Sequence, residues 1–233
     1  MGKLYLIPCT LGDNEPSEVL PQPVLDLLPE LTSFIVEEIR TARRFLSRAG
    51  LKGHIESLEF HELNEHTTAA EVEALLPLLD RSDVGLISEA GLPAVADPGA
   101  ALVALCHKKG VEVVPLVGPS SLMLALMASG LDGQSFAFRG YLPAKTDERR
   151  SALKTVEKQS AQLHQSEIFI ETPYRNDSLF ADMLAGLSGS TRICVAADLT
   201  LPTQFIRTRT VERWKAEKGF LIGKRPCVFI ILA

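Results

Sequence analysis

The chain has 233 residues and a formal net charge of −5 at pH 7, from 24 Lys and Arg against 29 Asp and Glu. This length fits one large domain or two domains of roughly 115 residues each. The acidic balance argues against a protein coated in basic patches for nucleic acid, although it allows a local patch. No apolar run approaches the roughly 18 residues that a membrane span requires, and the N-terminal MGKLYLIPCT predicts a strand rather than a signal peptide.

Cysteine and histidine placement indicates neither disulfides nor a metal site. The cysteines are scattered, mostly within apolar runs, and form no CxxC pair: Cys9, Cys106, Cys194 and Cys227. Buried free thiols in a reducing, cytoplasmic setting are therefore expected. His61 and His66 have the wrong spacing for one helix face and no nearby cysteine, so we predict that no metal is bound.

The first half of the chain alternates short apolar runs with helical patterns. Strands are predicted at residues 4–7, 33–36, 55–60, 84–87 and 111–117. Helices are predicted at residues 21–31, from the early forties to Gly50, over 68–79 and over 100–109. Thr68 with Glu71 forms a capping-box pattern, and Gly110 closes the last helix. This alternation predicts a largely parallel sheet with helices on both faces.

Gly118-Pro119 interrupts the pattern and marks a boundary, which predicts domains at residues 1–117 and 118–233. The second half contains predicted strands at residues 136–142, 168–171, 192–197, 204–208 and 226–232. Helices are predicted at 120–129, up to about 163, at 178–187 and around Trp214, so we expect a second α/β domain with a mixed sheet. A basic turn with Lys145, Arg149 and Arg150 is either a solvated surface or a contact for RNA backbone.

The stretch 84–99, VGLISEAGLPAVADPG, has the features of a ligand loop. A buried strand ends in small residues and prolines, together with Ser88, Glu89 and Asp97. Open α/β sheets bind ligands at the carboxyl ends of their strands, and small residues allow a ligand to approach the backbone closely. The loop after the first strand, residues 8–14, has one glycine where a dinucleotide fold would carry GxGxxG, which disfavours an NAD site.

Seven segments in order suggest a family: IPCTLGDN, VEEIRTARRFL, FHELNEH, LISEAGLPAVADPG, VPLVGPSSLMLALMASGL, FRGYLPAK and FIETPYR. The series resembles the tetrapyrrole methylase superfamily of S-adenosylmethionine-dependent methyltransferases, and within it most resembles the ribosomal RNA small subunit methyltransferase I branch. The likeness extends from Leu4 to about Trp214. Its most specific parts are the loop AGLPAVADPG and the segment GPSSLMLALMASGL.

The resemblance implies two α/β domains of the class III methyltransferase type, with S-adenosylmethionine in the cleft between them. It also implies a homodimer and a ribose 2′-hydroxyl of 16S ribosomal RNA, in the small ribosomal subunit, as methyl acceptor. Matching the motifs residue by residue gives the expected cofactor contacts: Leu11, Ser88, Glu89, Ala90, Gly91, Ala94, Val95, Ser120, Ser121, Glu171, Thr172 and Leu199.

Several motifs depart from the branch. The chain has Glu38-Ile39-Arg40 where the branch commonly has Asp-Thr-Arg, and Glu89 and Leu92 where it has Asp and Thr. It has residues 197–200, ADLT, in place of Arg-Glu-Leu-Thr, and it ends before the small C-terminal extension of many members. These changes lie near the expected substrate side. Two alternatives therefore stay open: a tetrapyrrole or other small molecule as acceptor, and a catalytically silent S-adenosylmethionine-binding module.

Methyl transfer from a sulfonium needs positioning and exclusion of water, and a ribose hydroxyl must also lose its proton. Polar residues at the ends of strands are the candidates for catalysis: Glu37, Glu38, Arg40 and His61. The favoured interpretation of Glu37 and Glu38 is that they are acids at a helix N-terminus, where the helix dipole stabilises them. Arg40 is either a phosphate clamp or a solvated side chain.

Overall fold

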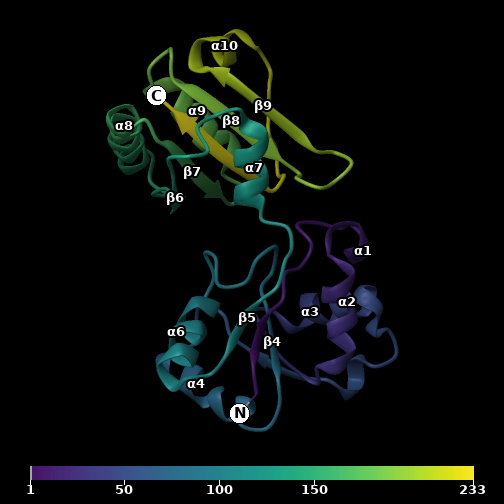
Figure 1. Ribbon diagram of the computed structural model, residues 1–233. Coiled ribbons are helices and arrows are strands. Elements are labelled where there is room, and N and C mark those ends of the chain that lie inside the picture. Colours follow the sequence, from purple (N-terminus) through teal and green to yellow (C-terminus); the bar gives the residue numbers. More distant parts are fainter. Residues whose placement is uncertain (1) are drawn as a thin grey trace. The chain divides into compact units, whose positions relative to one another are not determined.

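The computed structural model describes residues 2–233 (Figure 1). The chain divides into two compact units, Met1–Ser120 and Ser121–Ala233. Each unit has its own five-stranded sheet and its own hydrophobic core. They are described separately below.

The first unit is built on a fully parallel sheet, as the alternating sequence pattern predicts. Its strands are β1 (Leu4–Leu6), β2 (Ser33–Val36), β3 (Glu59–Glu62), β4 (Val84–Ile87) and β5 (Val113–Pro115). Their order is β3-β2-β4-β1-β5. Val36 pairs with Ile87, and Leu6 pairs with both Leu86 and Pro115. The loops after β1, β2, β4 and β5 therefore all leave from one edge of the sheet.

Helices cover both faces of this sheet (Figure 1). One layer contains α1 (Pro16–Val19), α2 (Gln22–Leu27) and α3 (Ile39–Leu46), and the other contains α4 (Ala69–Ala74), α5 (Leu76–Leu79) and α6 (Gly99–Lys109). Because strand side chains alternate between faces, Phe34 and Val36 pack with the first layer and Ile35 with the second. All three side chains are fully buried, which fixes the register of β2.

Two predicted elements of this unit are shifted or divided. The strand predicted at 55–60 lies at Glu59–Glu62, and a 3-10 turn occupies Ile55–Ser57. Pairing with β2 decides the register, since Ser33 lies opposite Glu59. The helix predicted at 68–79 has the expected capping box but divides at Leu75. Pro77 lacks the N–H that would continue its hydrogen bonds.

The second unit has the predicted mixed sheet, in the order β6-β7-β10-β8-β9. Its strands are β6 (Phe136–Tyr141), β7 (Ser166–Glu171), β8 (Arg192–Ala197), β9 (Phe205–Thr210) and β10 (Cys227–Leu232). Only β6 and β7 pair in parallel; the other three pairs are antiparallel. The helices of this unit are α7 (Ser121–Ser129), α8 (Thr146–Leu163), α9 (Asn176–Gly186) and α10 (Val211–Ala216).

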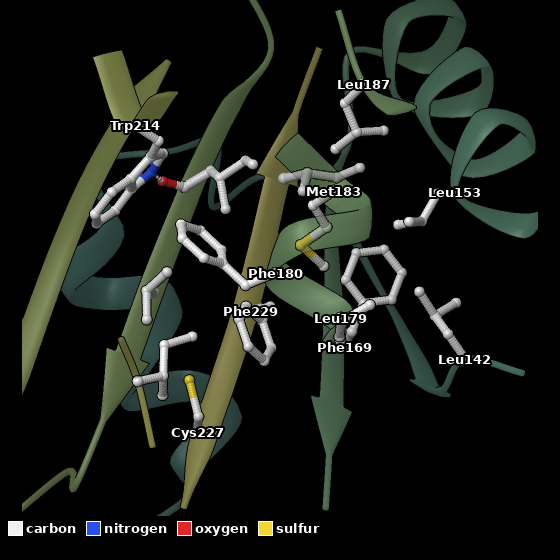
Figure 2. Close-up of a cluster of buried hydrophobic side chains, with 14 of the residues drawn as sticks. Leu142, Leu153, Phe169, Leu179, Phe180, Met183, Leu187, Trp214, Cys227 and Phe229 are labelled. Carbon is white, nitrogen blue, oxygen red and sulfur yellow. Dashed lines mark hydrogen bonds between the residues drawn. The ribbon is translucent and has the colours of Figure 1, made fainter. Parts of the chain in front are cut away.

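One face of the second sheet packs against α8, α9 and α10 through a core rich in large side chains (Figure 2). Phe180 of α9 meets the Trp214 ring edge-on, with 5.2 Å between centroids. The Trp214 Nε1–H donates to the carbonyl of Ile193 at 3.0 Å, so the buried indole has its partner. On the other face, α7 packs against β8, β9 and β10, and Thr208 Oγ1 donates to the Ser129 carbonyl at 2.6 Å.

The interpretation of residues 145–150 as a basic surface is wrong for Arg149. This side chain is only 2 % exposed, and its Nε donates to Asp182 Oδ2 at 2.7 Å. Arg150 Nε also donates to Asp182, while Lys145 pairs with Glu148. A buried carboxylate without a cation is costly. Arg149 therefore neutralises Asp182 inside this unit and is not available to bind RNA.

The four cysteines are free and buried, as expected from their apolar surroundings. Burial raises the pKa of all four thiols, to about 12 for Cys9. They are therefore protonated at neutral pH and behave as small apolar side chains.

Candidate functional site

Three loops meet at the carboxyl edge of the parallel sheet. Cys9 N donates to the carbonyl of Gly91 at 2.9 Å, which ties the loop after β1 to the loop after β4. Gly91 has φ +71°, and a Cβ placed there would lie 3.0 Å from Leu11 Cδ2 and 3.2 Å from the Pro119 carbonyl oxygen. The structure thus brings Leu11, Gly91 and the segment leading to Ser120 together, and any side chain at Gly91 would be strained by its positive φ and would displace Leu11 or Pro119.

The loop after β4 has an unusual backbone. Ala94 and Ala96 have φ of 65° and 62°, a region that residues other than glycine rarely adopt. Val95 lies between them and is 45 % exposed. The carboxylate of Asp97 accepts a hydrogen bond from Gly99 N at 2.7 Å. Burial raises the pKa of Asp97, although the N–H groups of Gly99, Ala94 and Val95 act in the opposite direction.

Glu37 and Glu89 face each other at the ends of β2 and β4. Glu37 Oε2 accepts a hydrogen bond from Glu89 N at 3.2 Å. Burial, followed by the charge of Asp97 and then that of Glu65, raises the pKa of Glu37. Burial also raises the pKa of Glu89, and the charges of Glu37 and Glu38 add to this. Carboxylates with raised pKa values favour a positively charged ligand, because such a ligand relieves their mutual repulsion.

Glu38 and Arg40 have local roles in α3. The Glu38 carboxylate caps the helix by accepting hydrogen bonds from Arg40 N and Thr41 N, both at 2.7 Å. The hydroxyl of Thr41, followed by the Arg40 N–H, lowers the pKa of Glu38, which makes it a poor base. Arg40 is exposed on the helix surface.

A cavity of about 430 Å³ opens between the first loop, α3 and the start of the β4 loop. Its walls are residues 9–14, residues 87–90, the face of α3 that carries Thr41, Arg44 and Phe45, and Arg48 in the turn that follows α3. The cavity therefore includes four predicted cofactor contacts: Leu11, Ser88, Glu89 and Ala90. It lies entirely within the first unit.

His61 lies in a different place from the other candidates. It sits within β3, not at its end, and lines a second cavity of about 670 Å³ with His66 and Glu71. None of the predicted cofactor contacts lines that cavity. The nearest acid to the His61 ring is Glu59, with Oε2 4.0 Å from Nε2.

Glu171 and Thr172 form a corner at the end of β7 in the second unit. Glu171 Oε1 accepts hydrogen bonds from Thr172 N at 2.7 Å and from Arg175 Nη2 at 2.6 Å. Its Oε2 is buried and has no hydrogen-bond partner among residues 2–233. Oε1 thus holds Thr172 and Arg175 in place, while Oε2 can still accept a hydrogen bond from another group.

The other expected contacts of the second unit lie at a helix start and in a second strained loop. Ser121 is the first residue of α7 and directly follows Ser120. Leu199 is 6 % exposed and lies between Asp198 and Thr200, whose φ values are 51° and 72°. Asp198 N donates to the Pro226 carbonyl at 3.0 Å, and Asp198 Oδ2 accepts from Thr203 Oγ1 at 3.0 Å.

Two residues of the site, Asp97 and Arg44, lie outside the set of functional residues that the sequence predicts. The only signal for Asp97 is the DPG turn. The signal for Arg44 is the recurrence of Arg40, Arg44 and Arg48 every four residues, which places them on one helix face.

In the described part of the chain, no group of three or more His, Cys, Asp and Glu side chains is arranged to hold a metal ion. No described helix is both long and apolar enough to span a bilayer.

No family model matches the chain. It is 35 % identical over 232 residues to "Ribosomal RNA small subunit methyltransferase I" of Xylella fastidiosa, with 99 % of this chain and 81 % of the relative covered. It is 34 % identical over 198 residues to the protein of the same name from Vibrio cholerae, with 84 % of this chain covered. The chain spans only 65 % of the length of that relative.

Solved structures share the fold at low sequence identity. The methyltransferase CobJ aligns over 100 % of this chain and 94 % of its own, with a TM-score of 0.66 and 15 % identity. Uroporphyrin-III C-methyl transferase from Thermus thermophilus, complexed with S-adenyl homocysteine, aligns over 99 % and 97 %, with a TM-score of 0.59 and 18 % identity. The architecture of two α/β units is therefore that of the tetrapyrrole methylase fold.

Proposed function

Because the chain belongs to the ribosomal RNA small subunit methyltransferase I family, we propose that it transfers a methyl group from S-adenosylmethionine to ribosomal RNA. The proposed acceptor is a ribose 2′-hydroxyl of 16S RNA, presented by the small subunit. We further propose that the enzyme works in the cytoplasm as a homodimer. The observation that carries the proposal is the meeting of loops at Gly91 beside the acids Glu37 and Glu89.

The residues present fit S-adenosylmethionine. Gly91 presents its backbone without a side chain beside Leu11, so a ligand can approach this loop closely, and Glu37, Glu89 and Asp97 favour a cation such as the sulfonium. We propose that Ala94, Val95 and Ser120 also contact the cofactor. In the second unit the proposed contacts are Ser121, Thr172, Leu199 and the free Glu171 oxygen. Placement of the cofactor in a cleft between the units stays a prediction.

When bound, S-adenosylmethionine supplies an already activated methyl group, so the protein mainly positions the acceptor and accepts its proton. Glu89 is our choice of proton acceptor, because it lines the 430 Å³ cavity and its raised pKa suits general base catalysis. Glu37 acts as a positioning residue, since its carboxylate holds Glu89 N. Glu38 is committed to its helix cap, and His61 lies in another cavity.

The proposal is tested by incubating the protein with labelled S-adenosylmethionine and small ribosomal subunits that lack the modification. Uroporphyrinogen III and a reaction without acceptor serve as comparisons. We expect label in 16S RNA that nuclease releases as a 2′-O-methylated nucleotide. Label in uroporphyrinogen alone would move the acceptor to tetrapyrroles. If titration calorimetry showed no binding of the cofactor, a catalytic role would be ruled out.

The role of Glu89 has its own variant. Glu89→Gln keeps the size of the side chain but cannot accept the proton, so transfer should fall by about 100-fold or more. Affinity for S-adenosylhomocysteine, which has a neutral sulfur, should change by less than about threefold if Glu89 acts mainly on the proton. Glu73→Gln, an exposed position on α4, is the matched control. Full transfer by Glu89→Gln would assign the proton to another group.

A further inference from the structure

Two arginines line the 430 Å³ cavity of the first unit, and they differ in their partners. Arg48 is held by Asp13 and by Glu15 Oε1, the latter at 3.1 Å. Arg44, one helical turn earlier on the same face, has no hydrogen-bond or ion-pair partner in residues 2–233, although it lines the cavity. A guanidinium in this position is suited to an oxyanion, which it can bind through two parallel hydrogen bonds.

The remaining walls suit a nucleotide. Phe45 borders the cavity but belongs to the hydrophobic core and is only 8 % exposed, so it adds an apolar floor. The volume of about 430 Å³ lies within the usual range of small-molecule sites, roughly 300–1,000 Å³. Arg40 is exposed one turn before Arg44 on the same helix face, and it too has no ion pair among the described residues. The two guanidiniums thus give one face of this helix positive charge, which favours contact with the phosphates of a nucleic acid.

The position of the cavity distinguishes it from the cavity around His61. A methyl acceptor has to lie within about 3–3.5 Å of the methyl donor, so its pocket must share a wall with the proposed cofactor contacts. Leu11 and residues 88–90 provide such a wall here. The cavity around His61 shares no residue with those contacts. Of the two, only the Arg44 cavity can deliver an acceptor to the donor.

We propose that this cavity receives the acceptor nucleotide of single-stranded RNA, with Arg44 bound to its phosphate. The inference rests on the proposed function and adds to it the place and the phosphate contact of the substrate. Arg44 is thereby a determinant of RNA affinity, while Glu89 on the facing wall receives the hydroxyl proton.

The test measures RNA binding by fluorescence anisotropy, using a labelled single-stranded oligoribonucleotide of about ten nucleotides. The full chain is saturated with S-adenosylhomocysteine. Arg44→Gln should raise the Kd about tenfold and should reduce the slope of log Kd against log salt by about 0.7, the value for one phosphate of a single strand. Arg44→Lys keeps the charge but loses the paired hydrogen bonds, so its Kd should lie between that of the parent and that of Arg44→Gln.

Arg43→Gln is the matched control. It removes the same charge from the same helix, but Arg43 pairs with Glu56, lies over the Phe60 ring and does not line the cavity. Its RNA affinity should stay within about twofold of the parent, because its charge lies outside the proposed contact. All three variants should bind S-adenosylhomocysteine as the parent does, which excludes general damage to the fold.

The outcomes separate the cavity assignment from the proposed function. If the parent methylates RNA and Arg44→Gln keeps its RNA Kd, salt slope and KM, the cavity assignment is overturned and the proposed function stands. If RNA binding depends on Arg44 but no methyl group is transferred, the proposed function fails and the cavity remains an RNA site. If the parent binds no single-stranded RNA at all, the cavity assignment is overturned.

Discussion

The loop after β4 and the loop after β8 each place one predicted cofactor contact between two residues of positive φ. Val95 lies between Ala94 and Ala96, and Leu199 lies between Asp198 and Thr200. None of the four flanking residues is glycine, so each stores conformational energy, on the order of 1 kcal/mol or more. Such strain persists only where the surrounding structure imposes it.

The two loops are held by different means. The first depends largely on one carboxylate, because Asp97 accepts from Gly99 N and lies close to the N–H groups of Ala94 and Val95. Val95 itself is nearly half exposed. In the second loop, Leu199 is buried. The backbone N–H groups of Asp198 and Thr200 donate to Pro226 and Gln204, and the side chain of Asp198 accepts from Thr203. The first loop should therefore respond to single changes that the second one tolerates.

The largest effect is expected from Gly91→Val. The new side chain would meet Leu11 and the Pro119 carbonyl oxygen at a φ of +71°. We expect a loss of about 2–4 kcal/mol in the free energy of unfolding, and at least about 30-fold weaker binding of S-adenosylhomocysteine.

Gly110→Val is the control for Gly91→Val, since Gly110 has the same φ but no atom within 4 Å of the added Cβ. It should lose about 1–2 kcal/mol and keep its ligand affinity. Denaturant unfolding and calorimetry measure the two effects. Equal losses of affinity in both variants would remove Gly91 from the site.

Next in size is the contrast between Asp97→Ala and Asp198→Ala. Removing Asp97 should cost about 2 kcal/mol, since it leaves the N–H of the buried Gly99 without its acceptor. It should also weaken ligand binding about tenfold. Removing Asp198 loses the bond to Thr203 but keeps the backbone bond to Pro226, and should cost about 1 kcal/mol with less than threefold loss of affinity. If Asp198→Ala lost more affinity than Asp97→Ala, the second loop would be the more sensitive of the two, contrary to our expectation.

A smaller effect follows from pH. The pKa values of Glu37, Glu89 and Asp97 are raised in the folded chain, so the native state binds more protons than the unfolded state above the ordinary carboxyl pKa of about 4. Their contribution to stability is therefore present below that pH and is lost as pH rises through the raised values. Around them, Glu38 and Glu65 add negative charge, and Arg44 opposes it.

A bound cation offsets the cost of ionising these three carboxyl groups, because it stabilises the charged form. The affinity for S-adenosylmethionine, relative to its neutral-sulfur product S-adenosylhomocysteine, should thus rise a few-fold from about pH 4.5 to 7. Calorimetry across this range measures the ratio. Glu37→Gln should flatten the rise, whereas Glu73→Gln should leave it intact. A ratio that stays constant with pH in the parent would show that the sulfonium binds away from these acids.

Much of the fold of the first unit could be predicted, because its strands and helices follow from hydrophobic patterns within short stretches of sequence. Buried runs such as 84–87 and amphipathic helices between them specify a parallel sheet, and a parallel sheet brings the loops of Leu11, Ser88 and Ser120 to one edge. The small residues around Gly91 then identify the loop as a place where backbone approaches closely. These are properties of sequence spacing and side-chain size alone.

What could not be predicted depends on contacts between distant residues. Alanine carries no signal for positive φ, so the sequence does not indicate the backbone of Ala94 and Ala96, which lie close to Asp97 and its bond to Gly99 N. Arg149 was read as a surface charge because its partner Asp182 is 33 positions away. His61 was placed at the end of a strand because the pairing of β3 with β2 shifts that strand toward the C-terminus.

The smallest predicted effect tests whether the strain in the first loop has a use. Ala94→Gly should stabilise the chain by about 0.5 kcal/mol, because relief of the positive φ slightly exceeds the entropy gained by the unfolded chain. Ala104→Gly, at an exposed position inside α6, should instead cost about 1 kcal/mol. If the strained backbone presents Val95 to the cofactor, Ala94→Gly should also bind S-adenosylhomocysteine two- to threefold more weakly, because a looser loop must be ordered on binding. A gain in stability without loss of affinity would show that the strain is a by-product of the DPG turn.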